Sequence, residues 1–123
     1  MIEQDKQLNT ELLQKSIDYL ERKGYENIKA DMEGYESPKS FQKKGSDVSI
    51  TPDIVAERAG KKHYFEVGIK SEEPELLKSK WKFLETFSTM KNRNFKIITH
   101  RGHYKFTNDT LAEINLNKTP IRL

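Results

Sequence analysis

Asp53 and Glu66 are the residues of this chain whose types and spacing best suit a chemical reaction. Asp53 directly follows Pro52, and Glu66 lies in an apolar run between Phe65 and Val67. Hydrolysis of a phosphodiester requires stabilisation of charge on the phosphate and activation of a water molecule, and Mg²⁺ held by carboxylates provides both. The two acids are therefore candidate ligands of a divalent metal ion.

The two acids are predicted to lie on paired strands of one hairpin. Val48–Glu57 and His63–Lys70 each have the composition of a strand, and a turn at residues 59–60 separates them. From Asp53 to the turn is about seven residues, and from the turn to Glu66 about six, so the acids are expected roughly opposite each other. Side chains in this relation can point at one ion.

A metal site built on this hairpin needs further groups. The main-chain carbonyl of Val67, next to Glu66, is the candidate third ligand. A lysine beside the acids would orient the attacking water and offset the developing negative charge. The metal ligands predicted from the sequence are Asp53, Glu66 and Val67.

Other segments are expected to build the sheet and helices that hold the hairpin. They are a helix over Gln4–Lys23, a strand over Tyr25–Met32, a loop over Glu33–Gly45, a helix over Pro74–Lys91, strands over Phe95–His100 and His103–Phe106, and a short helix from Asn108 or Asp109 to Leu116. Because the helix over 74–91 joins two strands, these strands are expected to be parallel, whereas the hairpin is antiparallel. The sequence therefore predicts one α/β domain over residues 1–123, with a mixed sheet of about four to five strands flanked by helices, in the order α-β-β-β-α-β-β-α.

The composition indicates a folded protein outside the membrane. Charged residues make up 33% of the chain and hydrophobic residues 34%, the latter in periodic clusters, and there is no cysteine for disulfides or thiolate metal sites. No run approaches the roughly 20 apolar residues of a membrane span. The first ten residues carry acids and lack the apolar core of a signal peptide, so we expect a cytoplasmic location.

Lysines concentrate in the expected loop before the hairpin. Lys39, Lys43 and Lys44 lie there, followed by Ser46, although the net charge of the whole chain is only +3. Such a loop can follow a nucleic-acid backbone, or it can serve solubility alone. Lys43, Lys44 and Ser46 are the candidate nucleic-acid-binding residues.

The order of elements, with PD at 52–53 and EVGIK at 66–70, resembles the PD-(D/E)xK nuclease superfamily, and among its members the small Holliday junction resolvases. The resemblance extends from about Leu8 to Phe106. It implies a restriction-endonuclease-like three-layer core and cleavage of DNA, branched DNA included, that depends on Mg²⁺ or Mn²⁺. It also implies a homodimer, and it assigns Asp53 and Glu66 as metal ligands.

Two positions depart from the family pattern. The family's lysine belongs at Gly68, which has no side chain; Lys70, about 6.6 Å further along the same strand face, is the candidate substitute, with Lys78 and Lys44 as others. The family's glutamate on the first helix has its nearest counterpart in Glu11, which falls on the opposite side from the apolar stripe. The predicted catalytic residues are thus Asp53, Glu66 and Lys70.

Three functional hypotheses remain open from the sequence. The first is the metal-dependent nuclease. The second is a catalytically inactive member of the same fold that acts as a nucleic-acid-binding or protein-interaction module, which Gly68 favours. The third is a small α/β domain of unrelated role, such as an antitoxin, immunity or adaptor protein, which a sheet without the hairpin would favour.

Overall fold

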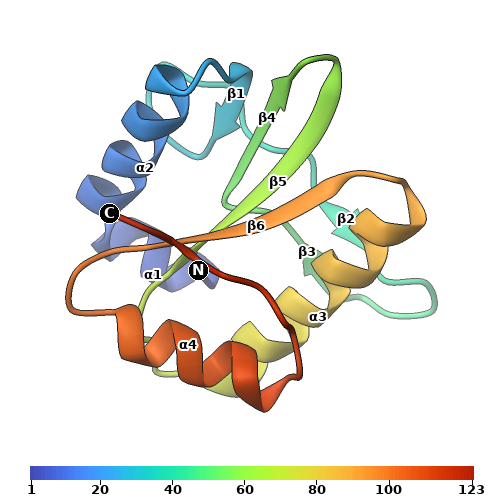
Figure 1. The fold of residues 1–123 in the computed structure, drawn as a ribbon. Coiled ribbons are helices and arrows are strands. Elements are labelled where there is room, and N and C mark those ends of the chain that lie inside the picture. Colours follow the sequence, from blue (N-terminus) through green and yellow to red (C-terminus); the bar gives the residue numbers. More distant parts are fainter.

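A five-stranded mixed sheet lies between helices on its two faces (Figure 1). The structure is a computed structural model that describes residues 1–123. Across the sheet the strands follow the order β1 (Glu26–Ala30), β4 (Ile54–Arg58), β5 (Lys61–Gly68), β6 (Asn94–Thr99) and β7 (Ile121–Arg122). The first two pairings are antiparallel and the last two parallel, so the predicted mixed α/β sheet is confirmed.

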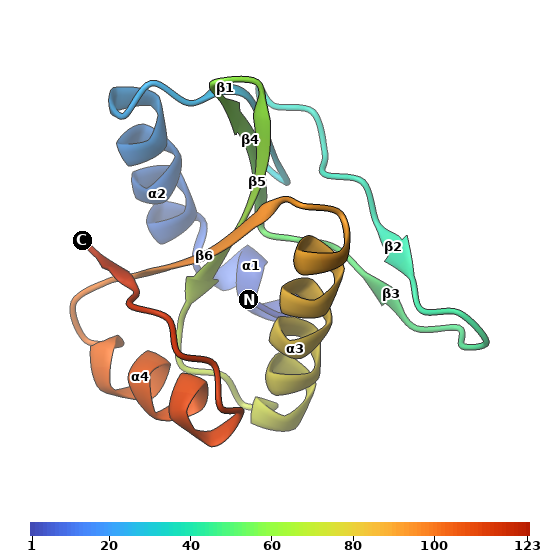
Figure 2. The same cartoon turned by 45° about the vertical axis from the view of Figure 1, so that its right-hand side comes forward.

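Four helices cover the sheet: α1 (Glu3–Leu8), α2 (Thr10–Arg22), α3 (Pro74–Met90) and α4 (Tyr104–Glu113). One face packs against α2 through Leu13, Ile17 and Leu20. The other face packs against α3 and α4, where Trp81 and Leu111 are among the buried side chains. Figure 2 shows α2 on one side of the sheet and α3 on the other.

The predicted hairpin is present as β4 and β5. Its turn consists of Ala59 (φ +53°) and Gly60 (φ +74°), and positive φ at both central residues matches the right-handed twist of the paired strands. Ile54 pairs with Phe65 at the far end of the ladder. The residues beyond that pair, Asp53 and Glu66, therefore meet where the hairpin opens.

The strand predicted over Val48–Glu57 is interrupted before it reaches the main sheet. Its first part is β3 (Ser49–Ile50), which pairs with β2 (Phe41–Gln42) in a separate two-stranded arm that projects from the body (Figure 2). Pro52 lies at the break, because a proline has no N–H to donate to a ladder. The loop predicted over Glu33–Gly45 accordingly contains β2.

Other boundaries also differ from the sequence prediction. The first predicted helix is two helices, because Asn9 leaves the helical conformation (φ −129°, ψ 35°). The strand predicted over His103–Phe106 is wrong, because Gly102 (φ +93°) turns the chain and α4 begins at Tyr104. No helix is long and apolar enough to cross a membrane.

Candidate active site

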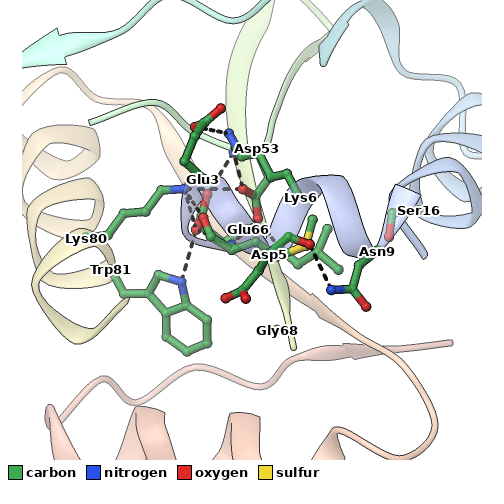
Figure 3. Close-up of polar contacts among 12 residues, drawn as sticks. Glu3, Asp5, Lys6, Asn9, Ser16, Asp53, Glu66, Gly68, Lys80 and Trp81 are labelled. Carbon is green, nitrogen blue, oxygen red and sulfur yellow. Dashed lines mark hydrogen bonds and ion pairs between the residues drawn. The ribbon is translucent and has the colours of Figure 1, made fainter. Parts of the chain in front are cut away.

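Asp53 and Glu66 converge as predicted, and both are fully buried. The main-chain N–H of Asp53 donates to Glu66 Oε2 at 2.8 Å, and the main-chain N–H of Val67 donates to Asp53 Oδ2 at 2.8 Å. Each carboxylate is thus held by the backbone of the opposite strand. This exchange fixes the two acids side by side at the open end of the hairpin (Figure 3).

Lys80 of α3 bridges the two acids. Its Nζ lies 3.2 Å from Asp53 Oδ1 and 3.1 Å from Glu66 Oε1, and it also donates to the main-chain oxygen of Met1. A lysine ammonium has three protons, so these three acceptors use all of them. Figure 3 shows Lys80 reaching the acids from α3.

Two further positive groups and one neutral donor contact the same carboxylates. The ammonium of Met1 lies 2.5 Å from Asp53 Oδ2 and 3.0 Å from Glu66 Oε1. Lys6 of α1 places its Nζ 3.7 Å from Asp53 Oδ1. Trp81, adjacent to Lys80, donates its indole N–H to Glu66 Oε1 at 3.2 Å. All four carboxylate oxygens therefore have partners, and the negative charge of the pair is neutralised inside the protein.

These charges determine the protonation states of the site. Burial alone would raise the pKa of Asp53, but Lys80, the Met1 ammonium and Lys6 outweigh burial and lower that pKa to about 2. Burial alone would lower the pKa of Lys80, but Asp53 and Glu66 outweigh it and raise that pKa. Asp53 is thus a carboxylate and Lys80 an ammonium at neutral pH.

Lys70, the predicted catalytic lysine, lies away from the acids. Its side chain is exposed beyond the end of β5, and its main-chain N–H donates to His103 Nδ1 at 3.0 Å. A side chain at position 68 would overlap α4, because a Cβ there would lie 2.3 Å from Thr107 Oγ1. Helix α4 thus fills the space where a side chain at position 68 would begin, and Lys80 of α3 supplies positive charge to the acids.

The other substitutes considered from the sequence are also placed elsewhere. Lys78 pairs with Glu75 and Glu113, and Glu11 is exposed and pairs with Lys15. The buried acid of the N-terminal helices is Asp5 of α1, whose Oδ2 has no hydrogen-bond partner.

The predicted nucleic-acid-binding residues lie at the tip of the arm. Lys43 and Lys44 are exposed, whereas the Ser46 hydroxyl accepts a hydrogen bond from the main-chain N–H of Val48 at 3.0 Å and so stabilises the turn. Figure 2 shows this tip projecting away from the sheet that carries the acids. The two lysines are accessible to a partner, while Ser46 has a local role.

Sequence reasoning missed Lys80, and one signal could have found it. On α3 the buried stripe contains Leu77, Trp81 and Leu84. Lys80 follows Leu77 by three positions and precedes Leu84 by four, so it belongs to the same helix face. A lysine within an apolar stripe requires a buried acidic partner, and Asp53 and Glu66 were the available acids.

The donor chemistry of the acid pair suits Mg²⁺, although no group of three or more His, Cys, Asp or Glu side chains is placed to hold a metal ion. Mg²⁺ prefers oxygen ligands and is commonly bound through one or two carboxylates with several waters. The carboxylate oxygens here bind ammonium groups, so a metal ion would have to displace at least one of them.

Comparisons of the chain with protein-family models, curated proteins and solved structures found no match.

Proposed function

We propose that the chain is a Mg²⁺- or Mn²⁺-dependent endodeoxyribonuclease of the restriction-endonuclease-like fold, with Asp53, Glu66 and Lys80 at its centre. The observation that carries the proposal is the contact of one ammonium group, that of Lys80, with both acids. With Lys80, the site has two carboxylates and a lysine, although position 68, where the resemblance expects the lysine, is a glycine.

Each residue has a distinct role in this proposal. Asp53 and Glu66 would hold the metal ion, with the main-chain carbonyl of Val67 as the third protein ligand. A bound metal ion stabilises negative charge on the phosphate and lowers the pKa of water. Lys80 keeps its proton because its pKa is raised. If Met1 leaves, the N–H that Lys80 donates to the Met1 main-chain oxygen becomes free to orient the water and to offset charge on the phosphate.

Met1 and Ile2 are the residues that would have to move for DNA and metal to reach the acids. Met1 contacts both carboxylates and the Lys80 ammonium, and Met1 and Ile2 precede α1. We expect DNA and metal to reach the acids when these two residues move aside, while the hairpin and α3 keep their places. Lys43 and Lys44 are the proposed contacts with the DNA backbone, and cleavage of both strands of a branched DNA would require two copies of the chain.

DNA cleavage by single-residue variants tests this proposal. Wild type is incubated with branched, linear duplex and single-stranded DNA in Mg²⁺ or Mn²⁺, beside Asp53→Asn and the control Glu72→Gln, which changes an exposed acid. We expect Asp53→Asn to reduce the cleavage rate by roughly 100-fold or more and Glu72→Gln to leave it unchanged. Circular dichroism verifies that both variants are folded. Equal behaviour of wild type and Asp53→Asn on every substrate would refute the proposal.

Full burial and internal neutralisation of the acids favour a second candidate, a domain of the same fold that binds nucleic acid or protein without cleaving. In that case the acid–lysine cluster serves stability alone. The same experiment separates the two candidates, because the second predicts folded protein that binds DNA, cleaves none of the substrates and shows no Asp53-dependent binding of Mg²⁺.

A further inference from the structure

A basic groove lies between the β2–β3 arm and the C-terminal end of α3. It has a volume of about 350 Å³. Its lining contains no acidic side chain and consists of the cations Lys29, Lys39, Lys62, Lys91 and Arg93 and the apolar or aromatic residues Phe41, Val55, Tyr64 and Phe87. Five positive groups around one concavity call for a negatively charged ligand.

The charge of the groove is almost unneutralised within the protein. Lys39, Lys62 and Lys91 form no ion pair, and Lys29 has only Glu36, at 3.9 Å. Arg93 donates to the hydroxyl of Tyr64, a neutral partner. Mutual repulsion of these cations raises the free energy of the empty groove, and a phosphate backbone that contacts several of them would relieve it.

Aromatic rings form part of the groove floor. Phe41 of the arm lies against Phe87 of α3 with ring centroids 4.4 Å apart, and its ring is perpendicular to that of Tyr64 with centroids 5.8 Å apart. Phe41 and Phe87 are both half-buried, so part of each ring faces the groove among the lysines. Aromatic faces within a basic groove suit unpaired bases, which stack on rings while their phosphates contact cations. The bases of a duplex are already stacked on one another.

We infer that this groove binds single-stranded nucleic acid, with phosphates on Lys62, Lys91 and Arg93 and a base against Phe41 and Phe87. In placing the bound strand on the sheet face that carries a reactive centre, the inference rests on the proposed function. Tyr64 precedes Glu66 by two positions on β5, so both lie on one sheet face about 6.6 Å apart along the strand. A strand bound in the groove thus lies on the sheet face that carries the acids, toward the turn of the hairpin.

Fluorescence anisotropy in EDTA measures binding without hydrolysis. The probes are labelled single strands of about 12 nucleotides, one of DNA and one of RNA, and a DNA duplex of the same length. The test variant is Lys62→Gln/Lys91→Gln. The matched control, Lys82→Gln/Lys105→Gln, removes the same charge from exposed positions outside the groove.

We expect the test variant to weaken single-strand binding by at least 10-fold and the control by less than 2-fold. The logarithm of the binding constant falls linearly with the logarithm of the salt concentration, and each lost phosphate contact makes this slope shallower by about 0.7. The slope should therefore become shallower by about 1.4 in the test variant. Phe87→Leu keeps an apolar side chain but removes the ring, and should weaken binding by about 5-fold or more. Preference for either the DNA or the RNA strand supports the inference and identifies the sugar.

Three results would overturn the inference: no single-strand binding at low salt, duplex binding as tight as single-strand binding, or equal losses in test and control variants. These results differ from failure of the proposed function. Groove-dependent binding without any cleavage in Mg²⁺ refutes the nuclease alone. Cleavage that is unaffected by the groove variants refutes only the inference that the groove binds the strand.

Discussion

Burial and neighbouring positive charge shift the pKa of the Asp53 carboxyl group in opposite directions. Transfer of a charged carboxylate into the protein interior is unfavourable by several kcal/mol unless opposite charges and hydrogen bonds compensate. Lys80, the Met1 ammonium and the N–H of Val67 supply that compensation within 3.2 Å. The acids are therefore stable as ions only in the presence of their partners.

Replacement of Lys80 by methionine should destabilise the protein strongly. Lys80→Met leaves two buried carboxylates with less positive charge, and the loss of one partner from a buried ion pair costs about 3–5 kcal/mol. Urea denaturation at pH 7 measures the change in the free energy of unfolding. The control Lys82→Met, on the exposed side of α3, should change it by about 0.5 kcal/mol or less. A loss below about 1 kcal/mol in Lys80→Met would show that the bridge is energetically unimportant.

The sequence allowed prediction of the acids but not of their lysine, for a physical reason. Strand periodicity and turn position determine which residues of a hairpin face each other, so Asp53 and Glu66 could be paired in advance. The same periodicity predicted Lys70, but β5 ends at Gly68 and the chain turns away before its side chain can reach back. The approach of Lys80 depends on how α3 packs on the sheet, which short-range patterns do not contain.

At the scale of elements, the contact between β5 and α4 explains why the site takes its lysine from a helix. Gly68 allows α4 to approach the strand closely, since Thr107 occupies the place of a side chain. Thr99 completes the contact by a hydrogen bond between its hydroxyl and that of Thr107 at 3.0 Å.

Addition of a methyl group at this contact should separate the two elements. Gly68→Ala should lower the free energy of unfolding by about 1–3 kcal/mol, because Cβ would overlap the Thr107 side chain. Gly68→Ala/Thr107→Ala removes the overlapping atoms and should recover part of that loss. Thermal and urea unfolding of the two single variants and the double variant measure the coupling. Strictly additive effects would contradict a direct contact.

Elements with a strong local signal were predictable, and those defined by distant contacts were not. The apolar stripes of α2 and α3 and the turn at residues 59–60 located the helices and the hairpin. Residues 103–106 fit a strand pattern as well as the first turn of a helix, because four residues are too few to separate the two. Ile121–Arg122 form a strand only because they pair with the edge of β6, so no pattern within that segment predicts β7.

At the scale of the whole molecule, protonation of His63 and of Asp53 should lower the free energy of unfolding at acid pH. Burial, with Lys96, Arg58 and Lys61 nearby, lowers the pKa of His63 from 6.5 to about 4. The unfolded chain therefore binds a proton more readily than the folded one between those values, and stability should fall as pH decreases from about 6.5 to 4. The Asp53 pKa, lowered from 3.8 to about 2, adds a second fall of about 2 kcal/mol between pH 4 and 2.

Unfolding free energies measured by urea between pH 7 and 2 check this profile. His63→Gln should flatten the stability profile between about pH 6.5 and 4, because a glutamine side chain does not titrate there. A wild-type profile that stays level from pH 7 to 2 would contradict both pKa assignments.

In the proposed function, Asp53 and Glu66 form one centre that exchanges its ammonium partners for a divalent ion. Trp81 is the single tryptophan of the chain, and its indole N–H donates to Glu66, so its NMR signal reports on this centre without ambiguity. Paramagnetic Mn²⁺ added at up to millimolar concentration should broaden that signal in wild type and leave it sharp in Asp53→Asn. An unbroadened Trp81 signal in folded wild-type protein would contradict the account.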